Sequence, residues 1–499
     1  MHRTHMAAVP QIDSQIPRAE LVAALGKILP AHALLTAPED LKPYECDGLS
    51  AYRALPMLAV LPRTVDEVQR ILRVACESGT KVVARGSGTG LSGGATPLGD
   101  GILMSMARFN RIVGIDALAR TACVQPGVRN LQISEEAAHL GLYYAPDPSS
   151  QIACSIGGNV AENSGGVHCL KYGLTVHNIL KLDVVTIEGE LITIGSDALD
   201  APGYDLMALM TGSEGMLGIT TEVTVKLVPK PQLARVVMAS FDDVESAGEA
   251  VANIIGAGIV PAGLEMMDKL ATEAVEGFVH AGYDLAAASI LLCESDGTPE
   301  EVAEEIAKIE AVMTASGATA CRTSTTEAER LKFWSGRKAA FPAVGRISPD
   351  YYCIDGSIPR RALAPVLKRT EELGRKYGLR CANVFHAGDG NLHPLILFDA
   401  NVSGELARTE AFAAELLELC IEVGGTITGE HGVGIEKINQ MCSQFTAGEI
   451  EMFFAVKRAF DERMLLNPGK AIPTLNRCAE YGRMRVSGGQ LPHADIPRF

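Results

Sequence analysis

Two histidines flank a strong hairpin signal in this 499-residue sequence. The segment reads HAGDGNLH, and its Asp389-Gly390 dipeptide is typical of a two-residue β-turn. If Gly388 and Asn391 flank that turn, His386 lies directly opposite His393, with the Cβ atoms about 5 Å apart. Two imidazoles at this spacing can bind one metal ion. The alternative is a pair of unrelated histidines at the rim of a sheet.

A second polar pair could complete such a site. The run GGTITGEHGVG from 424 to 434 carries Glu430 and His431 in a loop bracketed by glycines. A divalent ion needs a further ligand beside two imidazoles, and one member of this pair can supply it while the other transfers protons. Two imidazoles and a carboxylate suit zinc, manganese or iron, so the pattern leaves the identity of the metal open.

Arg337 is the candidate for anion recognition. Arg330, Trp334, Arg337 and Phe341 fall at i, i+4, i+7 and i+11, so one helical stripe carries this arginine, the only tryptophan and a phenylalanine. A guanidinium in that environment favours an anionic ligand. Two alternatives stay open: an internal partner among the sixty acidic residues, and a surface arginine that extends along apolar groups.

The run VVARGSGTGLSGGATP from Val82 to Pro97 predicts a phosphate-binding loop. Glycine allows positive φ and a close approach of the main chain, so consecutive N–H groups can surround an anion. The run contains G-x-G-x-x-G, but the dinucleotide fingerprint requires a helix directly after it. Gly94, Pro97, Gly99 and Gly101 follow instead. We therefore expect a loop that binds a pyrophosphate by itself rather than an NAD site; the alternative is a structural turn.

A second glycine-rich region, from Pro146 to Gly166, shows neither helical nor strand periodicity. We expect it to face the ligand as well. The run TGSEGMLGI from Thr211 to Ile219 precedes a further predicted strand.

The remaining pattern predicts an α+β protein with a boundary at Pro229-Lys-Pro231. A helix over 65–77 between strands at 53–61 and 81–84 forms a β-α-β unit that delivers the glycine loop. Further strands are predicted at 180–186, 190–194 and 220–227. Beyond the boundary we expect a strand from Val236, a strand at 289–294, and helices at 244–255, 299–315, 326–341, 405–423 and 449–463. The helix at 326–341 begins with a capping box and should be stopped by Pro342, and residues 467–470 form a sharp turn.

Composition excludes several classes of function. The net charge of −16 disfavours nucleic acid and anionic lipid as partners. No apolar run approaches the roughly 18 residues that a membrane span requires, and the N-terminus lacks the apolar segment of a secretory signal, so we expect a soluble, cytoplasmic protein. The twelve cysteines stand singly, without any C-x-x-C, which argues against a zinc ribbon, an iron–sulfur cluster or a disulfide framework.

The motifs together resemble a known family. The loop VVARGSGTGLSGG, the run PDPSSQIACSIGGNVAENSGG, TGSEGMLGI, HAGDGNLHP, TGEHGVG and NPGK are similar to those of FAD-linked oxidases of the vanillyl-alcohol oxidase superfamily. ISPDYYCIDGSIPRRAL, GGVHCLKYGLTVHN and INQMCSQF resemble the catalytic flavoprotein subunits of bacterial glycolate oxidases. The resemblance implies an α+β fold with a PCMH-type FAD-binding domain over 54–232 and a C-terminal α+β cap over 234–470. Residues 1–53 would form a tail and helical lead-in, and 471–499 a C-terminal tail.

The resemblance also implies roles for individual residues. His386, His393 and Glu430 match metal ligands, His431 a general base and Arg337 a carboxylate anchor, and Asn391 counts among the catalytic residues. The residues matched to FAD binding are Arg85, Gly86, Ser87, Gly88, Thr89, Gly90, Leu91, Ser92, Pro146, Asp147, Ser150, Gly157, Gly158, Asn159, Asn163, Gly165, Gly166, Glu214, Gly218, Ile219 and Asn467. The glycine loop lacks the histidine of covalent relatives, so FAD should be held non-covalently. Cys353 stands where relatives acting on diacids have a lysine, which favours a small monocarboxylate.

The implied reaction is the FAD-dependent oxidation of glycolate to glyoxylate by hydride transfer to the flavin. D-lactate is an alternative substrate, because one methyl group changes binding by only about 1 to 3 kcal/mol. A non-catalytic flavin-binding accessory subunit is the alternative from another class. Since the chain lacks clustered cysteines, electrons must leave through a partner or a diffusible acceptor. The resemblance implies a complex with an iron–sulfur subunit and a second flavin-type subunit, which would give indirect, peripheral association with the inner membrane.

Overall fold

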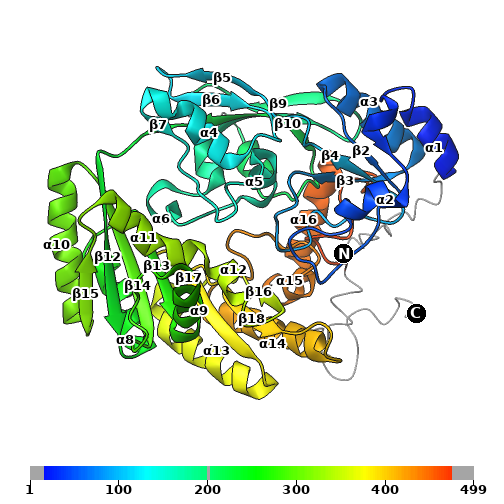
Figure 1. The fold of residues 1–499 in the computed structure, drawn as a ribbon. Coiled ribbons are helices and arrows are strands. Elements are labelled where there is room, and N and C mark those ends of the chain that lie inside the picture. Colours follow the sequence, from blue (N-terminus) through cyan, green and yellow to red (C-terminus); the bar gives the residue numbers. More distant parts are fainter. Residues whose placement is uncertain (1–15, 199–202, 475–499) are drawn as a thin grey trace, which may run out of the picture.

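The computed structural model describes residues 16–198 and 203–474. Two parts face each other in Figure 1: the N-terminal part holds three sheets, one of them only two-stranded, and the later part is built on one large sheet with helices on both faces. No helix among these described residues is long and apolar enough to cross a membrane.

The glycine loop directly follows an edge strand of a small, mostly parallel sheet. Its strand order is β1-β2-β4-β3, in which β2, β4 and β3 run parallel and β1 antiparallel. The elements are β1 (Leu34–Leu35), β2 (Leu58–Val60), α3 (Val65–Ser78), β3 (Lys81–Arg85) and β4 (Gly101–Ser105). The predicted helix is confirmed: a capping box between Thr64 and Glu67 begins α3, and Gly79 at φ +69° ends it. β2 is shorter than the predicted strand, and β4 lies between β2 and β3 in the sheet.

The second sheet of the N-terminal part is antiparallel, in the order β5-β6-β10-β8-β9. The elements are β5 (Ile112–Asp116), β6 (Thr121–Val124), α4 (Asn130–Ala137), β7 (Leu142–Tyr143), α5 (Ile156–Glu162), α6 (Cys169–Tyr172), β8 (Ile179–Val185), β9 (Leu191–Gly195), α7 (Leu206–Met210), β10 (Ile219–Lys226) and β11 (Val228–Pro229). The predicted strands at 180–186, 190–194 and 220–227 are confirmed within a residue or two. The region from Pro146 to Gly166, which shows no period in the sequence, contains the helix α5. This short helix buries only Ile156, Asn159 and Val160, which is too few residues for a visible period, and Asn163 ends it at φ +55°.

The later part is a seven-stranded antiparallel sheet in the order β15-β12-β14-β13-β17-β18-β16. The strands are β12 (Leu233–Phe241), β13 (Gly263–Asp268), β14 (Ser289–Gly297), β15 (Ala320–Thr323), β16 (Asp350–Cys353), β17 (Arg380–His386) and β18 (Pro394–Phe398). The helices are α8 (Val244–Gly256), α9 (Lys269–Val279), α10 (Pro299–Ala315), α11 (Glu327–Lys338), α12 (Ala340–Val344), α13 (Leu363–Tyr377), α14 (Glu405–Glu422), α15 (Ile438–Gln444) and α16 (Ala447–Phe460).

Because successive side chains of a strand point to opposite faces, the apolar residues of this sheet form two core layers, one on each face. Val237, Ala239 and Phe241 of β12 pack with α8, α10 and α13, whereas Val236 and Met238 pack with α9, α11 and α12 on the other face. Both faces are therefore covered by helices, which explains the nearly continuous apolar character of the strands. The helices are visible on either side of the sheet in Figure 1.

The prediction that Pro342 stops a long helix is wrong. α11 ends at Lys338, and Pro342 lies inside α12, at its third residue. Proline is tolerated there because the first N–H groups of a helix have no intrahelical acceptor. The predicted cap is half confirmed: Thr326 accepts a hydrogen bond from the Glu329 N–H, but the Glu329 carboxylate accepts from Thr325.

The last described elements return to the N-terminal part. Val456 and Phe460 of α16 pack against the core of the five-stranded sheet, and Leu466 pairs with Val82 of β3 (Figure 1). The predicted turn at 467–470 has Asn467 at φ +43° and Gly469 at φ +80°. Ten cysteines among the described residues are free thiols.

Candidate active site

One continuous cavity joins both parts of the protein. The glycine loop after β3 and residues of α5 line this cavity. His393, Glu430 and His431 of the later part line it as well. Lys338, Phe341 and Pro342, from the end of α11 and from α12, line it too. The cavity therefore connects the predicted phosphate-binding loops with the predicted catalytic groups, although these lie some 300 residues apart in the sequence.

Most residues matched to cofactor binding line this cavity. They are Arg85, Gly86, Ser87, Gly88, Thr89, Gly90, Leu91, Ser150, Gly157, Gly158, Asn159, Glu214, Gly218 and Ile219. Ser92, Pro146, Asp147, Asn163, Gly165, Gly166 and Asn467 do not line it. Asn467 contacts the lining residues, because its amide donates to the carbonyls of Gly94 and Glu214. Asp147 instead accepts from His168, which does not line the cavity.

Two glycines of the loop after β3 have neighbours too close for a side chain. A Cβ on Gly86 would lie 2.2 Å from the Ser155 hydroxyl, and one on Gly88, at φ +71°, would lie 2.1 Å from the Arg85 guanidinium. Glycine at both positions lets this backbone pack closely on its neighbours beside the cavity.

The predicted register of the histidine hairpin is wrong by two residues. His386 pairs with Asn391 rather than with His393, so the loop contains four residues, and Gly390 at φ +85° closes it by donating to the His386 carbonyl. The two histidines nevertheless meet, with ring centroids 5.0 Å apart. A shift of two residues preserves the face of the sheet, because side chains alternate with period two. The histidines are therefore diagonal neighbours.

His386, His393 and Glu430 converge as predicted. The Nε2 atoms of His386 and His393 lie 3.4 and 2.9 Å from Glu430 Oε1. Both Nδ1 atoms face acceptors, 2.6 Å from Glu265 Oε1 and 3.4 Å from the Ile354 carbonyl. With the protons on Nδ1, the two Nε2 lone pairs and the Glu430 carboxylate would be available together to one cation. The donor set fits a divalent metal ion, and Glu265 supplies the outer carboxylate that ligating histidines commonly have.

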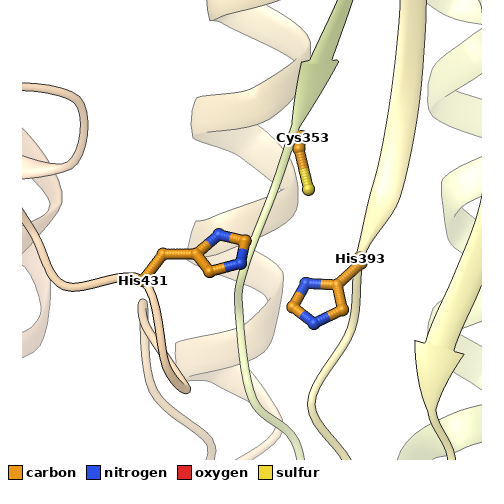
Figure 2. A group of neighbouring side chains, drawn as sticks. All are labelled: Cys353, His393 and His431. Atoms are coloured by element: carbon orange, nitrogen blue, oxygen red, sulfur yellow. The ribbon is translucent and has the colours of Figure 1, made fainter. Parts of the chain in front are cut away.

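A second group of metal-ligating side chains shares His393. Figure 2 shows Cys353, His393 and His431, whose ligand atoms lie within 4.8 Å of one another. Burial raises the pKa of the Cys353 thiol well above its usual range, which opposes formation of the thiolate that a metal needs. Burial opposes ionisation of the Glu430 carboxyl, but the neighbouring His386 and His393 lower its pKa well below its usual range. The group with Glu430 is the better site.

His431 has the environment of a base. Its ring stacks on that of His393 at 4.9 Å, and its Nδ1 is buried without a hydrogen-bond partner among the described residues. Burial lowers the pKa of His431 to about 4, and the neighbouring His393 acts in the same direction. The imidazole is therefore neutral near pH 7 and able to accept a proton.

Arg337 has an internal partner, which was one of the alternatives from the sequence. It is 2 % exposed and donates through Nε to Glu265 Oε2 at 2.6 Å. Arg330 and Trp334 of the same stripe both donate to Glu294 instead. Arg337 does not line the cavity, but its Nη2 is buried and lacks a partner within the described part of the chain. That donor is the one available for an anion.

The sequence did not reveal Glu265. It lies on β13, directly opposite His386 of β17, and its two oxygens join Arg337 to His386. The only signal was an acidic residue flanked by apolar ones in the strand GLEMMD. Asn391 is buried beside the loop that carries Glu430, where a Cβ on Gly429 would lie 2.1 Å from its amide nitrogen.

Comparison with protein families gives two matches. The family model described as "FAD binding domain" matches residues 56–195, and "FAD linked oxidases, C-terminal domain" matches residues 230–471. The solved structure of p-cresol methylhydroxylase superimposes with a TM-score of 0.77 at 18% identity, over 92% of this chain and 97% of that one. The fold is thus the predicted α+β arrangement with a PCMH-type FAD-binding domain.

Curated relatives cover nearly the whole chain. A glycolate oxidase subunit, GlcD, of Escherichia coli (strain K12) is 61% identical over 99% of this chain and 98% of its own length. GlcD of Bacillus subtilis (strain 168) is 40% identical over 86% of this chain and 91% of its own length. A D-lactate dehydrogenase of Anaerostipes hadrus is 30% identical over 90% of this chain and 97% of its own length.

Proposed function

Because the chain belongs to the FAD-linked oxidases, we propose that it oxidises glycolate to glyoxylate as the catalytic subunit of a glycolate oxidase complex. FAD is its cofactor. The observation that carries the proposal is the single cavity lined both by the glycine loops and by His393, Glu430 and His431. The greater identity to the two glycolate oxidase subunits favours glycolate over D-lactate.

In this proposal residues 54–232 hold FAD and residues 234–470 hold the substrate. The N–H groups of the loop from Gly86 to Leu91 bind the pyrophosphate. The loop contains no histidine, so the flavin is held without a covalent bond. Cys353 lies beside His393, and no lysine occupies that position to bind a second carboxylate; this favours a small monocarboxylate.

His386, His393 and Glu430 would hold a divalent ion. A bound ion supplies a Lewis acid for the substrate hydroxyl, and the flavin supplies the hydride acceptor. Arg337 binds the substrate carboxylate through its free Nη2 end, while Glu265 fixes its Nε end. The neutral His431 accepts the hydroxyl proton as the C–H hydrogen leaves as hydride.

Anaerobic titration of the flavin tests the proposed reaction. Glycolate should bleach the flavin absorbance faster than D-lactate, and both faster than L-lactate or D-2-hydroxyglutarate. Faster reduction by D-lactate would make the protein a D-lactate dehydrogenase. A flavin that no 2-hydroxy acid reduces would make it an accessory subunit.

The metal site is tested separately from the flavin site. His386→Ala and Glu430→Ala should remove the metal and turnover while leaving the FAD content unchanged, because the glycine loops hold FAD in the other part of the protein. Equal loss of FAD and activity, or full activity in metal-free protein, would contradict the metal assignment.

We also propose that electrons leave the reduced flavin through an iron–sulfur subunit, alongside a second flavin-type subunit. This would place the protein in the cytoplasm with indirect attachment to the inner membrane. The isolated chain should be reduced rapidly by glycolate, reoxidise slowly in air and turn over with artificial dyes. Rapid, stoichiometric release of hydrogen peroxide without a co-purifying partner would show a self-sufficient oxidase.

A further inference from the structure

A single buried carboxylate contacts the whole loop that carries Glu430 and His431. Asp355 follows β16 and has no exposed surface. It accepts hydrogen bonds from three consecutive backbone N–H groups, those of Gly429 (3.1 Å), Glu430 (3.1 Å) and His431 (2.9 Å). Consecutive N–H groups turned toward one point form an anion-binding nest, and here a side chain of the same protein fills it.

Side chains from two further segments reach the same carboxylate. Asn391 of the histidine hairpin donates its amide to Oδ1 at 2.9 Å, and Thr428 donates its hydroxyl to Oδ2 at 2.6 Å. Lys437, at the beginning of α15, donates to Oδ2 at 3.0 Å. Asp355 therefore joins the hairpin between His386 and His393 to the loop of Glu430 and His431.

Lys437 makes this arrangement electrically neutral. The side chains of Asp355 and Lys437 are both fully buried. Lys437 also donates to the carbonyl of Gly432, the residue that follows the three N–H groups of the nest, at 2.8 Å. Burial disfavours the charged form of Asp355, but Lys437 and smaller contributions from the neighbouring histidines together lower the pKa of this carboxyl below its usual range. The pair thus holds the loop at Thr428 to His431 and again at Gly432.

We infer that Asp355, neutralised by Lys437, is the positioning residue that sets Glu430 against the two histidines and His431 against the substrate. This inference rests on the proposed function, which assigns those roles to Glu430 and His431. In the proposed function, Asp355 contacts neither the substrate nor the cofactor. It acts through the backbone of the loop, and the Asn391 contact couples that backbone to the hairpin.

The competing interpretation is that Asp355 only neutralises a buried lysine. Asp355→Asn alone cannot separate the two, because it leaves the buried Lys437 with only Glu436, 3.6 Å away, as a counter-charge, and the protein could fail to fold. The double variant Asp355→Asn/Lys437→Met removes both charges and keeps the side-chain volumes. An asparagine offers one uncharged acceptor oxygen in place of two charged ones. If its oxygen takes the Oδ2 position, the Asn391 amide and the shorter Glu430 N–H contact lose their acceptor, and the remaining bonds of the nest lose the negative charge.

The matched control is a second buried pair, Lys457 and Asp461 of the α16 segment, with N and O atoms 2.6 Å apart. Lys457→Met/Asp461→Asn removes the same two charges without touching the loop. The probe is Co²⁺, titrated into metal-stripped, FAD-loaded protein and followed by visible absorbance, because its spectrum reports the ligand geometry. Flavin reduction by glycolate is measured on the same samples, and circular dichroism verifies the fold.

The folded double variant at Asp355 and Lys437 should bind Co²⁺ about 10- to 100-fold more weakly than the wild type, with an altered spectrum. Its flavin should be reduced more slowly at saturating glycolate. The control should stay within about twofold in both measurements. Wild-type Co²⁺ affinity, spectrum and reduction rate in the double variant would overturn the inference, as would an equal loss in the control. If the wild type itself binds no Co²⁺, the proposed metal site fails, and an unchanged rate of flavin reduction in the double variant then overturns the positioning role.

Discussion

Glu265→Gln tests the connection between the carboxylate anchor and the metal ligand. The Glu265 side chain is 1% exposed, and its oxygens lie 2.6 Å from Arg337 Nε and 2.6 Å from His386 Nδ1. Glutamine has nearly the same volume but only one acceptor atom. If the glutamine oxygen accepts from Arg337, the His386 Nδ1–H faces the amide NH₂ group, and if it accepts from His386, the Arg337 Nε–H does. In either case Arg337 loses its counter-charge.

The expected cost can be worked from these contacts. Removing one partner of a buried ion pair destabilises a protein by about 3 to 5 kcal/mol, because the remaining charge stays buried without compensation. This is a large part of a typical free energy of unfolding of about 5 to 15 kcal/mol, yet the protein should stay folded at 25 °C. Loss of an outer carboxylate weakens metal binding or activity by about 10- to 100-fold. Hence we expect a folded protein with a lower denaturation midpoint, less bound metal and slower flavin reduction.

The control is Glu294→Gln on the neighbouring strand β14. Glu294 is 2% exposed and also pairs with an arginine of α11, Arg330, at 2.8 Å, but it contacts no proposed metal ligand. Chemical denaturation, metal content and anaerobic reduction by glycolate are compared between the two variants. The reasoning is refuted if Glu265→Gln keeps full metal content and rate, or if Glu294→Gln loses metal to the same extent.

Three further predictions address charge and pH. Arg337→Lys should lower kcat and raise KM severely, because an ammonium cannot reproduce the planar guanidinium that bonds Glu265 and a carboxylate together; near wild-type kcat/KM would make the arginine structural. The rate of flavin reduction should fall only as pH drops toward the His431 pKa of about 4, since the neutral ring is the active form; a midpoint near 6.5 in stopped-flow measurements would contradict this. Asp147 and Glu294 raise the pKa of His168 to about 10 against the effect of burial. The charged ring therefore stabilises the folded protein fully below about pH 6.5, the pKa of histidine in the unfolded chain, and this stabilisation is lost as pH rises through 10. The difference in unfolding free energy between the wild type and His168→Asn should therefore shrink from pH 6.5 to 10, and a constant difference would disprove the link.

Local signals in the sequence determined the elements that depend on near neighbours. The helix at 65–77 was predictable because its apolar residues recur at helical spacing and Thr64 caps it. The loop after β3 was predictable because glycines and Pro97 exclude a helix there. Pro342 misled the prediction, since its tolerance inside α12 depends on where the preceding helix ends. The helix α5 could not be predicted from the sequence, because most of the residues that pack against it are distant in the sequence.

The candidate site shows the same division. The sequence by itself determined which residue types could bind a metal, accept a proton and bind a carboxylate, because that chemistry belongs to the side chains. It also fixed the face shared by His386 and His393, since even register shifts preserve alternation, although the predicted pairing was wrong. Only the tertiary structure decided that Glu265 joins Arg337 to His386 and that Asp355 holds the loop of Glu430 and His431. These contacts join residues 72 to 121 positions apart. They are created by the pairing of strands and the docking of loops, which no local pattern encodes.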